Sequence, residues 1–423
     1  MVTRAENERL TRVGPGTPMG DLLRRYWHPI LFRSEIDKPD GPPVRVRILG
    51  EDLLAFRDTT GVVGLVDAYC PHRRAQLFFG RNEKCGIRCV YHGWKFDVNG
   101  NCVELPSEPA SSGIMSRVKI KSYPVIEKAG LIWTYMGPPE HKPAPPDYEW
   151  TRTPDTHRFI SKNHQASNFL QGLEGGLDTS HSTFLHDMDI SGGSMIRSRD
   201  GAPKIEIFPR DYGYSYVSRR DLGADGEYVR VYQYIMPFTQ FRGDNVGMTG
   251  QSNKVPKIDG HLWVPIDDHQ TMSWNFMYGF DQNTPIPEEY SAWFEKLVGR
   301  APEDYVPGTY ALKRNLANDY LIDREVQRTK TSSGIEGINT QDIALQESMG
   351  PIVDRSQETL VTSDNAIIAM RKVLLKATYA IEQGQPAPGA DPLTHRGVRA
   401  YDCIVPRGTN WQDAVADHVT ARW

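Results

Sequence analysis

Two short motifs in the first quarter of the chain constrain its fold more than any other feature. Each motif pairs one cysteine with one histidine: Cys70-Pro71-His72 and, after a gap of sixteen residues, Cys89-Val90-Tyr91-His92. Thiolates and neutral imidazoles are metal ligands. We expect each motif to form one loop that supplies one thiolate and one imidazole, so the fold must bring the two loops together around a single metal centre.

The residues around these motifs follow the two-residue period of β-strands. Apolar residues and arginines alternate over residues 44–48, which predicts a half-buried strand. The Asn99-Gly100 pair predicts a hairpin turn. A Pro-rich segment at 137–146 ends the pattern. We therefore predict a small all-β domain over residues 40–145 and a second, larger domain formed by residues 1–39 and 146–423.

The chemistry of the two motifs favours an iron–sulfur cluster over zinc. Two cysteines on one iron and two histidines on the other form the Rieske type of [2Fe–2S] cluster, whose reduction potential rises from about −400 mV to the range of about −150 to +300 mV. A Cys2His2 zinc site, the alternative, usually pairs its cysteines two to four residues apart and places its histidines later. The predicted cluster ligands are Cys70, His72, Cys89 and His92. The other cysteines, which we expect to be ordinary core or surface residues, are Cys85, Cys102 and Cys403.

A second candidate metal site lies in residues 168–186, NFLQGLEGGLDTSHSTFLH. On one helix, Glu174, Asp178 and His181 would share a face, at positions i, i+4 and i+7. His186 follows five residues after His181, so the helix must end or bend between the two histidines if both bind one metal. Two imidazoles and one carboxylate form the facial triad of non-haem Fe(II) oxygenases. Taken alone, the stretch fits better a half-buried helix whose histidines only form hydrogen bonds; the upstream motifs favour iron.

Composition excludes several other classes of protein. The net charge is −4, from 49 basic and 53 acidic residues, without a long run of either sign. We therefore expect no nucleic acid and no anionic membrane surface as a partner. No stretch approaches the roughly 20 apolar residues that span a bilayer, and the N-terminus lacks the apolar core of a secretory signal. We expect a cytoplasmic protein with reduced thiols.

With these two motifs in this order, the chain resembles the oxygenase component, or alpha subunit, of the Rieske non-haem iron ring-hydroxylating oxygenases over nearly its whole length. Within this family it looks most like the phthalate dioxygenase group, which includes aromatic O-demethylases. The segments 71–81, 168–181 and 340–356 carry that similarity. The resemblance implies an α+β fold, in which a small all-β Rieske domain accompanies a larger catalytic domain. That catalytic domain would have an antiparallel sheet flanked by helices, of the helix-grip or START-like kind.

The resemblance also implies which residues bind the mononuclear Fe(II). His181 and His186 would be two ligands. The third ligand in this family is a carboxylate far downstream, and Asp342 occupies the matching position. The competing carboxylates are Asp323, Glu325 and Glu347.

Asp178 would not be a ligand in this family. It would form a hydrogen bond with an iron-bound histidine and reach His92 of the partner subunit, which would carry electrons between subunits and make a homotrimer, or a stacked hexamer, the functional unit. Glu174 would either support the site or serve a structural role. The residues expected as polar packing nearby are Asn168 and Gln171.

The implied activity is O2-dependent cis-dihydroxylation of a small aromatic carboxylate, with electrons from an NADH-dependent flavin–ferredoxin reductase. O-demethylation of a methoxylated aromatic acid by the same iron chemistry is the alternative. An electron-transfer protein or a zinc-binding module without oxygenase activity is a third class, against which the second iron motif argues. A substrate carboxylate needs a cation in a mostly apolar pocket. We favour Arg230, which shares a strand face with Tyr232 and Tyr234, and Arg242. The weaker candidates are Lys204 and Arg210.

Overall fold

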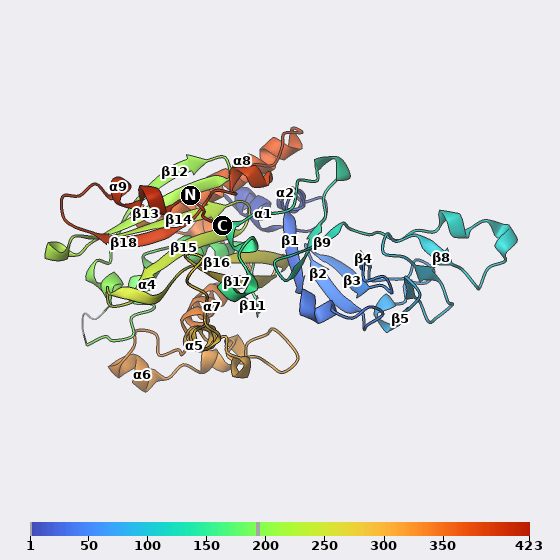
Figure 1. The fold of residues 1–423 in the computed structure, drawn as a ribbon, viewed down its shortest axis with the longest axis horizontal. Helices are drawn as coiled ribbons and strands as arrows, with labels where there is room; N and C mark the ends of the chain where they lie inside the picture. The colour runs from blue at the N-terminus through green and yellow to red at the C-terminus, as the bar shows by residue number, and fades with distance from the viewer. Residues whose placement is uncertain (1, 192–194) are drawn as a thin grey trace. The chain divides into compact units, whose positions relative to one another are not determined.

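The computed structural model describes residues 2–191 and 195–423 and divides the chain into two compact units (Figure 1). The smaller unit comprises residues 13–16 and 20–145, and the larger comprises residues 1–12, 17–19 and 146–423. Placing residues 20–39 in the larger domain is therefore wrong. Strand β1 (Trp27–Phe32) pairs antiparallel with β10 (Leu131–Tyr135), which joins this segment to the small unit by backbone hydrogen bonds.

The small unit is built from three antiparallel sheets. The strands are β2 (Val44–Ile48), β3 (Glu51–Arg57) and β4 (Val63–Asp67) in one sheet; β5 (Arg81–Asn82), β6 (Ile87–Arg88), β7 (Lys95–Phe96) and β8 (Cys102–Glu104) in a second; and β1, β10 and β9 (Val125–Lys128) in a third. The predicted hairpin at Asn99-Gly100 connects β7 to β8. Leu54, Phe56 and Leu77 are fully buried in the core, which also includes Cys70 and Cys89. The two cysteine loops thus rest directly on the packed interior.

The large unit contains an eight-stranded antiparallel sheet. Its order is β11-β17-β16-β15-β14-β13-β12, and β18 also pairs with β14. The strands are β11 (Arg158–Gln165), β12 (Lys204–Arg210), β13 (Gly213–Asp221), β14 (Glu227–Ile235), β15 (Thr239–Val246), β16 (Ser252–Asp267), β17 (Gln270–Gly279) and β18 (Tyr401–Val405). On β14, Arg230 and Tyr232 point to one face while Val229 and Val231 pack in an apolar cluster on the other. The alternation that the sequence predicted for this strand is confirmed.

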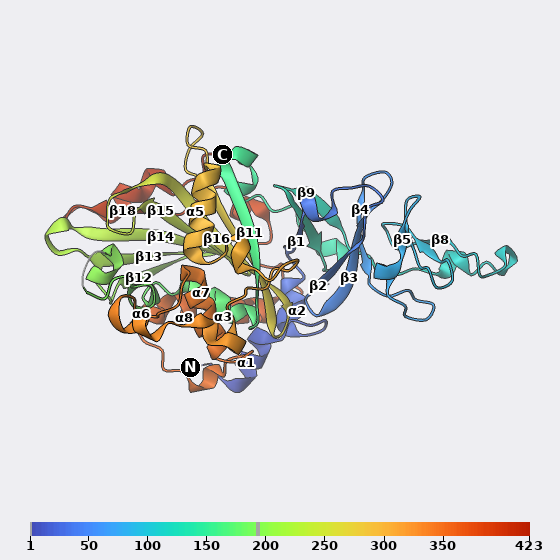
Figure 2. The same ribbon diagram turned by 90° about the horizontal axis from the view of Figure 1, so that it is seen from below.

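Helices cover one face of the sheet (Figure 2). The helices of the chain are α1 (Arg4–Thr11), α2 (Pro18–Leu23), α3 (Phe169–Leu177), α4 (His181–Phe184), α5 (Glu288–Val298), α6 (Arg324–Thr329), α7 (Ile338–Ser348), α8 (Asn365–Glu382) and α9 (Trp411–Val415). Helix α3 packs on β15, β16 and β17, and α8 packs on β12 and β13. The predicted α+β class, with an antiparallel sheet flanked by helices, is confirmed. None of the helices in the described residues is long and apolar enough to cross a bilayer.

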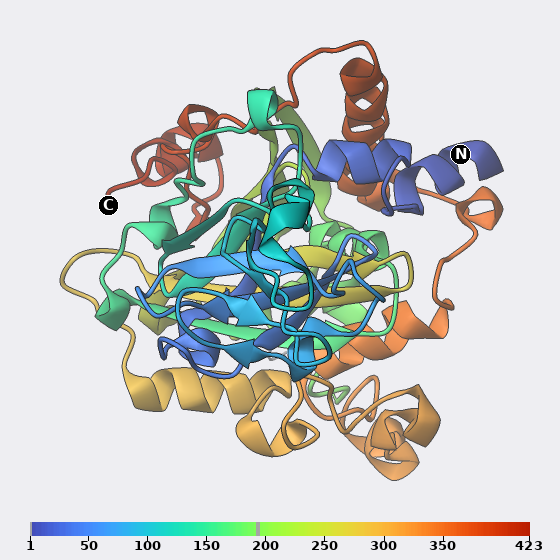
Figure 3. The same ribbon diagram turned by 90° about the vertical axis from the view of Figure 1, so that its right-hand side faces the viewer.

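The N-terminal helix belongs to this large unit, although nearly the whole chain separates it from its neighbour. Helix α1 packs against α8 (Figure 3), and the Nε of Arg9 donates a hydrogen bond to Oγ1 of Thr378 at 2.8 Å. The helix α3 that leads to the candidate iron site is held between α7, α8 and the sheet. The site therefore begins from a buried and well-anchored element.

Candidate iron site, cavity and cluster site

The chain leaves the helical conformation just before the two candidate histidines. Helix α3 ends at Leu177, Asp178 has an extended backbone (φ −68°, ψ 124°), and α4 begins at His181. The Asp178 carboxylate accepts hydrogen bonds from the backbone N–H groups of Ser180 and His181, at 2.7 and 3.3 Å, which favours the start of a new helix over continuation of the old one. The predicted single helical face for Asp178 and His181 is therefore wrong. The predicted helix end between the histidines is confirmed, because α4 stops at Phe184.

This break brings three potential ligands together. The Nε2 atoms of His181 and His186 lie 3.2 Å apart. Oδ1 of Asp342, which α7 carries, lies 3.3 Å from Nε2 of His181 and 3.2 Å from Nε2 of His186. Two imidazoles and one carboxylate, converging on a single point, could hold one metal ion in the facial arrangement that leaves other positions open.

The electrostatics of these groups suit a shared cation. Burial alone would raise the pKa of Asp342, but His186 and His181 outweigh it and hold that pKa well below its ordinary value. Burial alone would lower the pKa of His181, but the carboxylates of Asp178 and Asp342 raise it to about 10. Both shifts have one cause, which is the attraction of half-buried carboxylates for positive charge. A divalent ion at this point would supply that charge in place of the proton.

Each histidine has a different group behind it. Nδ1 of His186 donates a hydrogen bond to Oε1 of Gln341 at 2.8 Å, and Nε2 of Gln341 in turn donates to the carbonyl oxygen of Ile335 at 2.8 Å. Nδ1 of His181 lies 3.5 Å from Oδ2 of Asp178. Both contacts orient the Nε2 lone pairs toward Asp342, as the outer partners of metal-binding histidines commonly do. Sequence reasoning missed Gln341, although its position beside Asp342 was the available signal.

The competing carboxylates lie elsewhere. Asp323 caps α6 by accepting hydrogen bonds from two of its backbone N–H groups, and Glu325 forms an exposed ion pair with Arg328. Glu347 accepts a hydrogen bond from the hydroxyl of Tyr320. Among the described residues, the group that could bind a metal comprises His181, His186 and Asp342 and does not include Glu347.

Glu174 has contacts that favour the structural alternative. Its carboxylate accepts hydrogen bonds from Nε and a terminal nitrogen of Arg355, both at 2.8 Å, and from Nε of Arg371 at 2.6 Å. Asn168 caps α3 through its side chain, and Gln171 donates to the backbone carbonyl oxygens of Gln346, near the end of α7, and of Gly350, just after it. All three residues anchor α3 and do not face the metal position.

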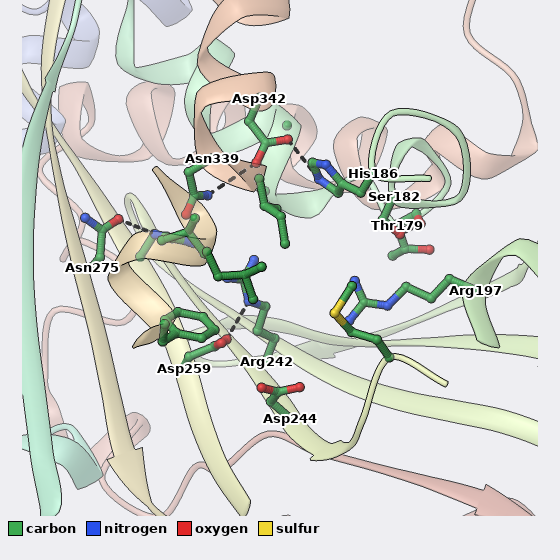
Figure 4. A pocket seen from close by; sticks show the side chains of 18 of the residues that line it. Thr179, Ser182, His186, Arg197, Arg242, Asp244, Asp259, Asn275, Asn339 and Asp342 are labelled. Carbon is green, nitrogen blue, oxygen red and sulfur yellow. Dashed lines mark hydrogen bonds and ion pairs between the residues drawn. The ribbon is translucent and has the colours of Figure 1, made fainter. Parts of the chain in front are cut away.

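A cavity of about 650 Å³ opens beside the three ligands. Figure 4 shows Asp342 and His186 on one side of it and Arg242 with Asp259 on the opposite side. The cavity wall includes Arg197, Arg230, Arg242, His261 and Asn275, together with apolar side chains from α5. A concave, mostly apolar space with a few polar groups is typical of a binding site for a small organic molecule.

The predicted substrate cations divide into two pairs. Arg230 and Arg242 both line the cavity, whereas Lys204 and Arg210 are exposed on β12 and outside it. Arg242 forms an ion pair with the buried Asp259, so its charge is already neutralised.

Two other arginines of the cavity lack such a partner. Arg230 is buried and donates two hydrogen bonds to the carbonyl oxygen of Gly243. Arg197, which sequence reasoning missed, also lines the cavity (Figure 4). Neither forms an ion pair with a carboxylate in the described part of the chain. Only tertiary structure could reveal Arg197, because it lies in a 3-10 helix of a single turn (Ile196–Arg199), which is too short to show a periodic pattern.

The two cysteine loops of the small unit have matching backbones. The carbonyl oxygen of Cys70 accepts a hydrogen bond from the N–H of Arg74, and that of Cys89 accepts one from the N–H of Gly93, both at 2.9 Å. Arg74 and Gly93 both have positive φ, at 59° and 78°. A left-handed residue at the same place in each loop turns both chains in the same way, so the two motifs present their side chains as a pair.

The side chains of these loops fit a cluster with two chemically different ends. Cys70 and Cys89 are buried, whereas His72 is exposed and His92 is half-buried, with their Nδ1 atoms 3.1 Å apart. The ring of His72 stacks on Trp94, which restricts its orientation. Burial, aided by the neighbouring Cys89, raises the pKa of the Cys70 thiol to about 11. A buried thiol of this kind is ionised when a metal binds it, so this donor set fits a [2Fe–2S] cluster with thiolate and imidazole ends.

Fold and sites together define a Rieske-type non-haem iron oxygenase. The family model for the Rieske [2Fe-2S] domain matches residues 26–124, and the model described as LigXa C-terminal domain like matches residues 134–422. The first match lies within the small unit, and the second covers residues 134–145 of the small unit and residues 146–422 of the large one. The enzyme class and its two cofactors, a [2Fe–2S] cluster and a mononuclear iron, follow from them.

The relatives identify the group within this class. The chain is 38% identical to the phthalate 4,5-dioxygenase oxygenase subunit of Pseudomonas putida, over 100% of this chain and 96% of the relative. It is 35% identical to the 3-chlorobenzoate-3,4-dioxygenase oxygenase subunit of Comamonas testosteroni, over 99% of each. It is 34% identical to the 5,5'-dehydrodivanillate O-demethylase oxygenase subunit of a Sphingobium strain, over 100% of this chain and 90% of the relative. The chain belongs to the Rieske non-haem iron oxygenases, as an oxygenase subunit of the phthalate dioxygenase-like group.

Solved structures agree on the fold. NdmA of Pseudomonas putida CBB5 matches with a TM-score of 0.62 and 18% identity, over 93% of this chain and 100% of that chain. Dicamba monooxygenase bound to dicamba matches with a TM-score of 0.60 and 17% identity, over 86% of this chain and 99% of that chain. At such identities the likeness concerns architecture and not the substrate.

Proposed function

We propose that this protein is the terminal oxygenase of a system that adds both atoms of O2 to the ring of an aromatic carboxylate, by cis-dihydroxylation. The observation that carries the proposal is Arg197, a cation that forms no ion pair with the described carboxylates and lies in the wall of the cavity beside His181, His186 and Asp342. A guanidinium in a mostly apolar space is a strong site for a carboxylate. Two of the relatives are named for phthalate and chlorobenzoate, which are aromatic carboxylates.

In this proposal each metal has a defined set of ligands. The mononuclear iron is held by His181, His186 and Asp342. The cluster ligands are Cys70, His72, Cys89 and His92. When bound, the iron supplies the position where O2 is activated, and the cluster supplies the electrons one at a time.

The surrounding residues have positioning roles. Gln341 holds the proton of His186 on Nδ1, which leaves Nε2 free to bind metal. Asp178 lies 3.5 Å from Nδ1 of His181 and orients that ring by electrostatic attraction. Arg197 anchors the carboxylate, with Arg230 as a second cation of the wall, while Arg242 is held by Asp259 and shapes the far end of the cavity.

We also propose an assembly of subunits in which electrons pass from the cluster of one subunit to the iron of its neighbour. Asp178 reaches His92 of the partner subunit and links its cluster to this iron, so that a homotrimer, or two stacked trimers, is the functional unit. The electrons come from NADH through a flavin or ferredoxin reductase in the cytoplasm. The partial exposure of the Asp178 side chain supports this role, because a fully enclosed carboxylate could not meet a partner subunit.

O-demethylation of a methoxylated aromatic acid is the second candidate. The relative that is named as a dehydrodivanillate O-demethylase supports it, as do the uncharged polar groups His261 and Asn275 of the cavity wall. The two reactions need the same iron ligands and differ in which carbon of the substrate faces the metal.

Product analysis separates the two reactions. The enzyme is supplied with NADH, a reductase and 18O2, and tested on phthalates, chlorinated and phenoxy benzoates, and methoxylated aromatic acids. A diol with two labelled oxygens establishes dihydroxylation, whereas a phenol with formaldehyde establishes O-demethylation. If the panel yields no labelled diol, and no phenol with formaldehyde, both reactions are contradicted.

Substitution of arginine tests the carboxylate site directly. We expect Arg197→Ala to weaken the binding of benzoate by a factor of roughly 10 to 100, since a hydrogen bond to a charged group contributes about 1.5–3 kcal/mol. Arg210→Ala is the matched control, because Arg210 is exposed and outside the cavity. Equal benzoate affinity in the two variants contradicts the role of Arg197.

A further inference from the structure

A row of uncharged polar side chains reaches the cavity wall, and the proposed dihydroxylation assigns no contact to it. Ser161, Asn275 and His261 stand directly opposite one another on the adjacent strands β11, β17 and β16. Asn275 and His261 line the cavity, as does Asn163. All except Ser161 are buried. A buried polar row is costly unless each group has a hydrogen-bonding partner.

Hydrogen bonds along the row set the proton of the imidazole. Nδ2 of Asn275 donates to Oδ1 of Asn163 at 3.1 Å and to Oγ of Ser161 at 3.3 Å. Its Oδ1 therefore faces His261 and accepts a hydrogen bond from Nδ1 at 2.7 Å. In this arrangement Nδ1 carries the proton, so Nε2 of His261 has an unshared electron pair.

This imidazole is uncharged. Burial, and then the positive charges of Arg242 and Arg300, lower the pKa of His261 to about 3. The imidazole therefore cannot supply a charge to a carboxylate, and its lone pair would repel one. The ionised end of a substrate belongs at Arg197, and only a neutral hydrogen-bond donor suits His261.

Among the described residues, the hydrogen bonds of the His261 ring involve Nδ1, which contacts Asn275, and leave Nε2 without a donor. The side chain is 5% exposed and lines the cavity. An acceptor in that position is satisfied by what enters the cavity.

We propose that Nε2 of His261 accepts a hydrogen bond from a hydroxyl group on the ring of the substrate, so that the substrate is a hydroxylated aromatic acid. This inference rests on the proposed function, which places the carboxylate at Arg197, and it narrows that function to aromatic acids with a free phenol. A methyl ether or a halogen at the same ring position lacks the proton and would leave the acceptor unpaired.

Paired probes test the contact on the anaerobic enzyme with both iron centres filled. Dissociation constants are measured by calorimetry for 3- and 4-hydroxybenzoate and for the matching fluorobenzoates, in which fluorine replaces the hydroxyl group. We expect at least one hydroxybenzoate to bind about tenfold more tightly than its fluoro counterpart, as for one hydrogen bond of about 1.4 kcal/mol. In His261→Leu that ratio should fall to near one, and His261→Gln, which offers an amide oxygen, should restore part of it.

His164→Leu is the control, because His164 lies on β11 outside the cavity, and it should keep the full ratio. Equal binding of both hydroxybenzoates and their fluoro counterparts by the natural enzyme overturns the proposal, as does a full ratio in His261→Leu. Failure of every benzoate to bind contradicts the carboxylate site instead. In that case the contact is tested with phenol and fluorobenzene. Equal dissociation constants for these two compounds would overturn it.

Discussion

Replacing Glu174 by glutamine should destabilise the large unit without changing the chemistry at the iron. The Glu174 side chain is buried and accepts hydrogen bonds from Arg355, which is fully buried, and Arg371, which is nearly so. Glutamine keeps the shape but removes the charge, so two guanidinium groups lose the carboxylate between them. Arg371 retains Glu358 as a partner, whereas Arg355 retains only neutral acceptors.

The expected magnitude follows from this burial. Removing one partner of a buried ion pair costs about 3–5 kcal/mol. Each kcal/mol lowers Tm by roughly 2–4 °C in domains of this size, so we expect Tm to fall by about 10 °C. Glu325→Gln is the matched control, because its pair with Arg328 is largely exposed, and exposed pairs contribute little.

The assay is thermal unfolding with iron content and turnover measured on the folded protein at 20 °C. We expect a lower Tm with normal turnover per iron for Glu174→Gln. Burial alone would raise the pKa of Glu174, but Arg355 and Arg371 lower it. The stabilisation is therefore complete above the unfolded-state pKa of about 4.3 and is lost as the pH falls through the lower folded-state pKa. An unchanged Tm, or loss of iron at unchanged Tm, would refute the structural role.

Three further substitutions test the iron site. Gln341→Leu should weaken the binding of Co(II) to the mononuclear site by about 10–100-fold, measured by optical titration, while Gln341→Glu should retain it; equal affinities contradict the role of the amide behind His186. Asp342→Ala should lower the iron content from about three to about two per chain, since two irons belong to the cluster; three irons would exclude Asp342 as a ligand. Asp178→Asn should leave both metals bound while turnover collapses, and normal turnover would exclude the link between subunits.

Local sequence identified much of this protein because metal ligands are few in kind and strict in spacing. Cys70 and His72, like Cys89 and His92, are close in the chain, so one loop positions each pair. Strand alternation and the hairpin signal likewise depend on neighbours in sequence. Asp342 followed only from resemblance, since no spacing rule relates it to His181.

Other features depended on contacts between distant segments. Residues 20–39 belong to the small unit because β1 pairs with β10, about a hundred residues later in the chain. Helix α3 ends before Asp178 because the Asp178 carboxylate accepts hydrogen bonds from the backbone N–H groups that follow it. The helical spacing of residues in the sequence continues through Asp178 and gave no sign of this end.

The sequence alone predicted two metal centres and most of the side chains that would bind them, because ligand chemistry is a property of residue type. Only the tertiary structure decided which charges remain available to a substrate. Arg242 and Arg197 look alike in sequence, but folding places Asp259 beside the former and no carboxylate of the described residues beside the latter. The free energy of a charge depends on what surrounds it, and those surroundings come from strands and loops far apart in the chain.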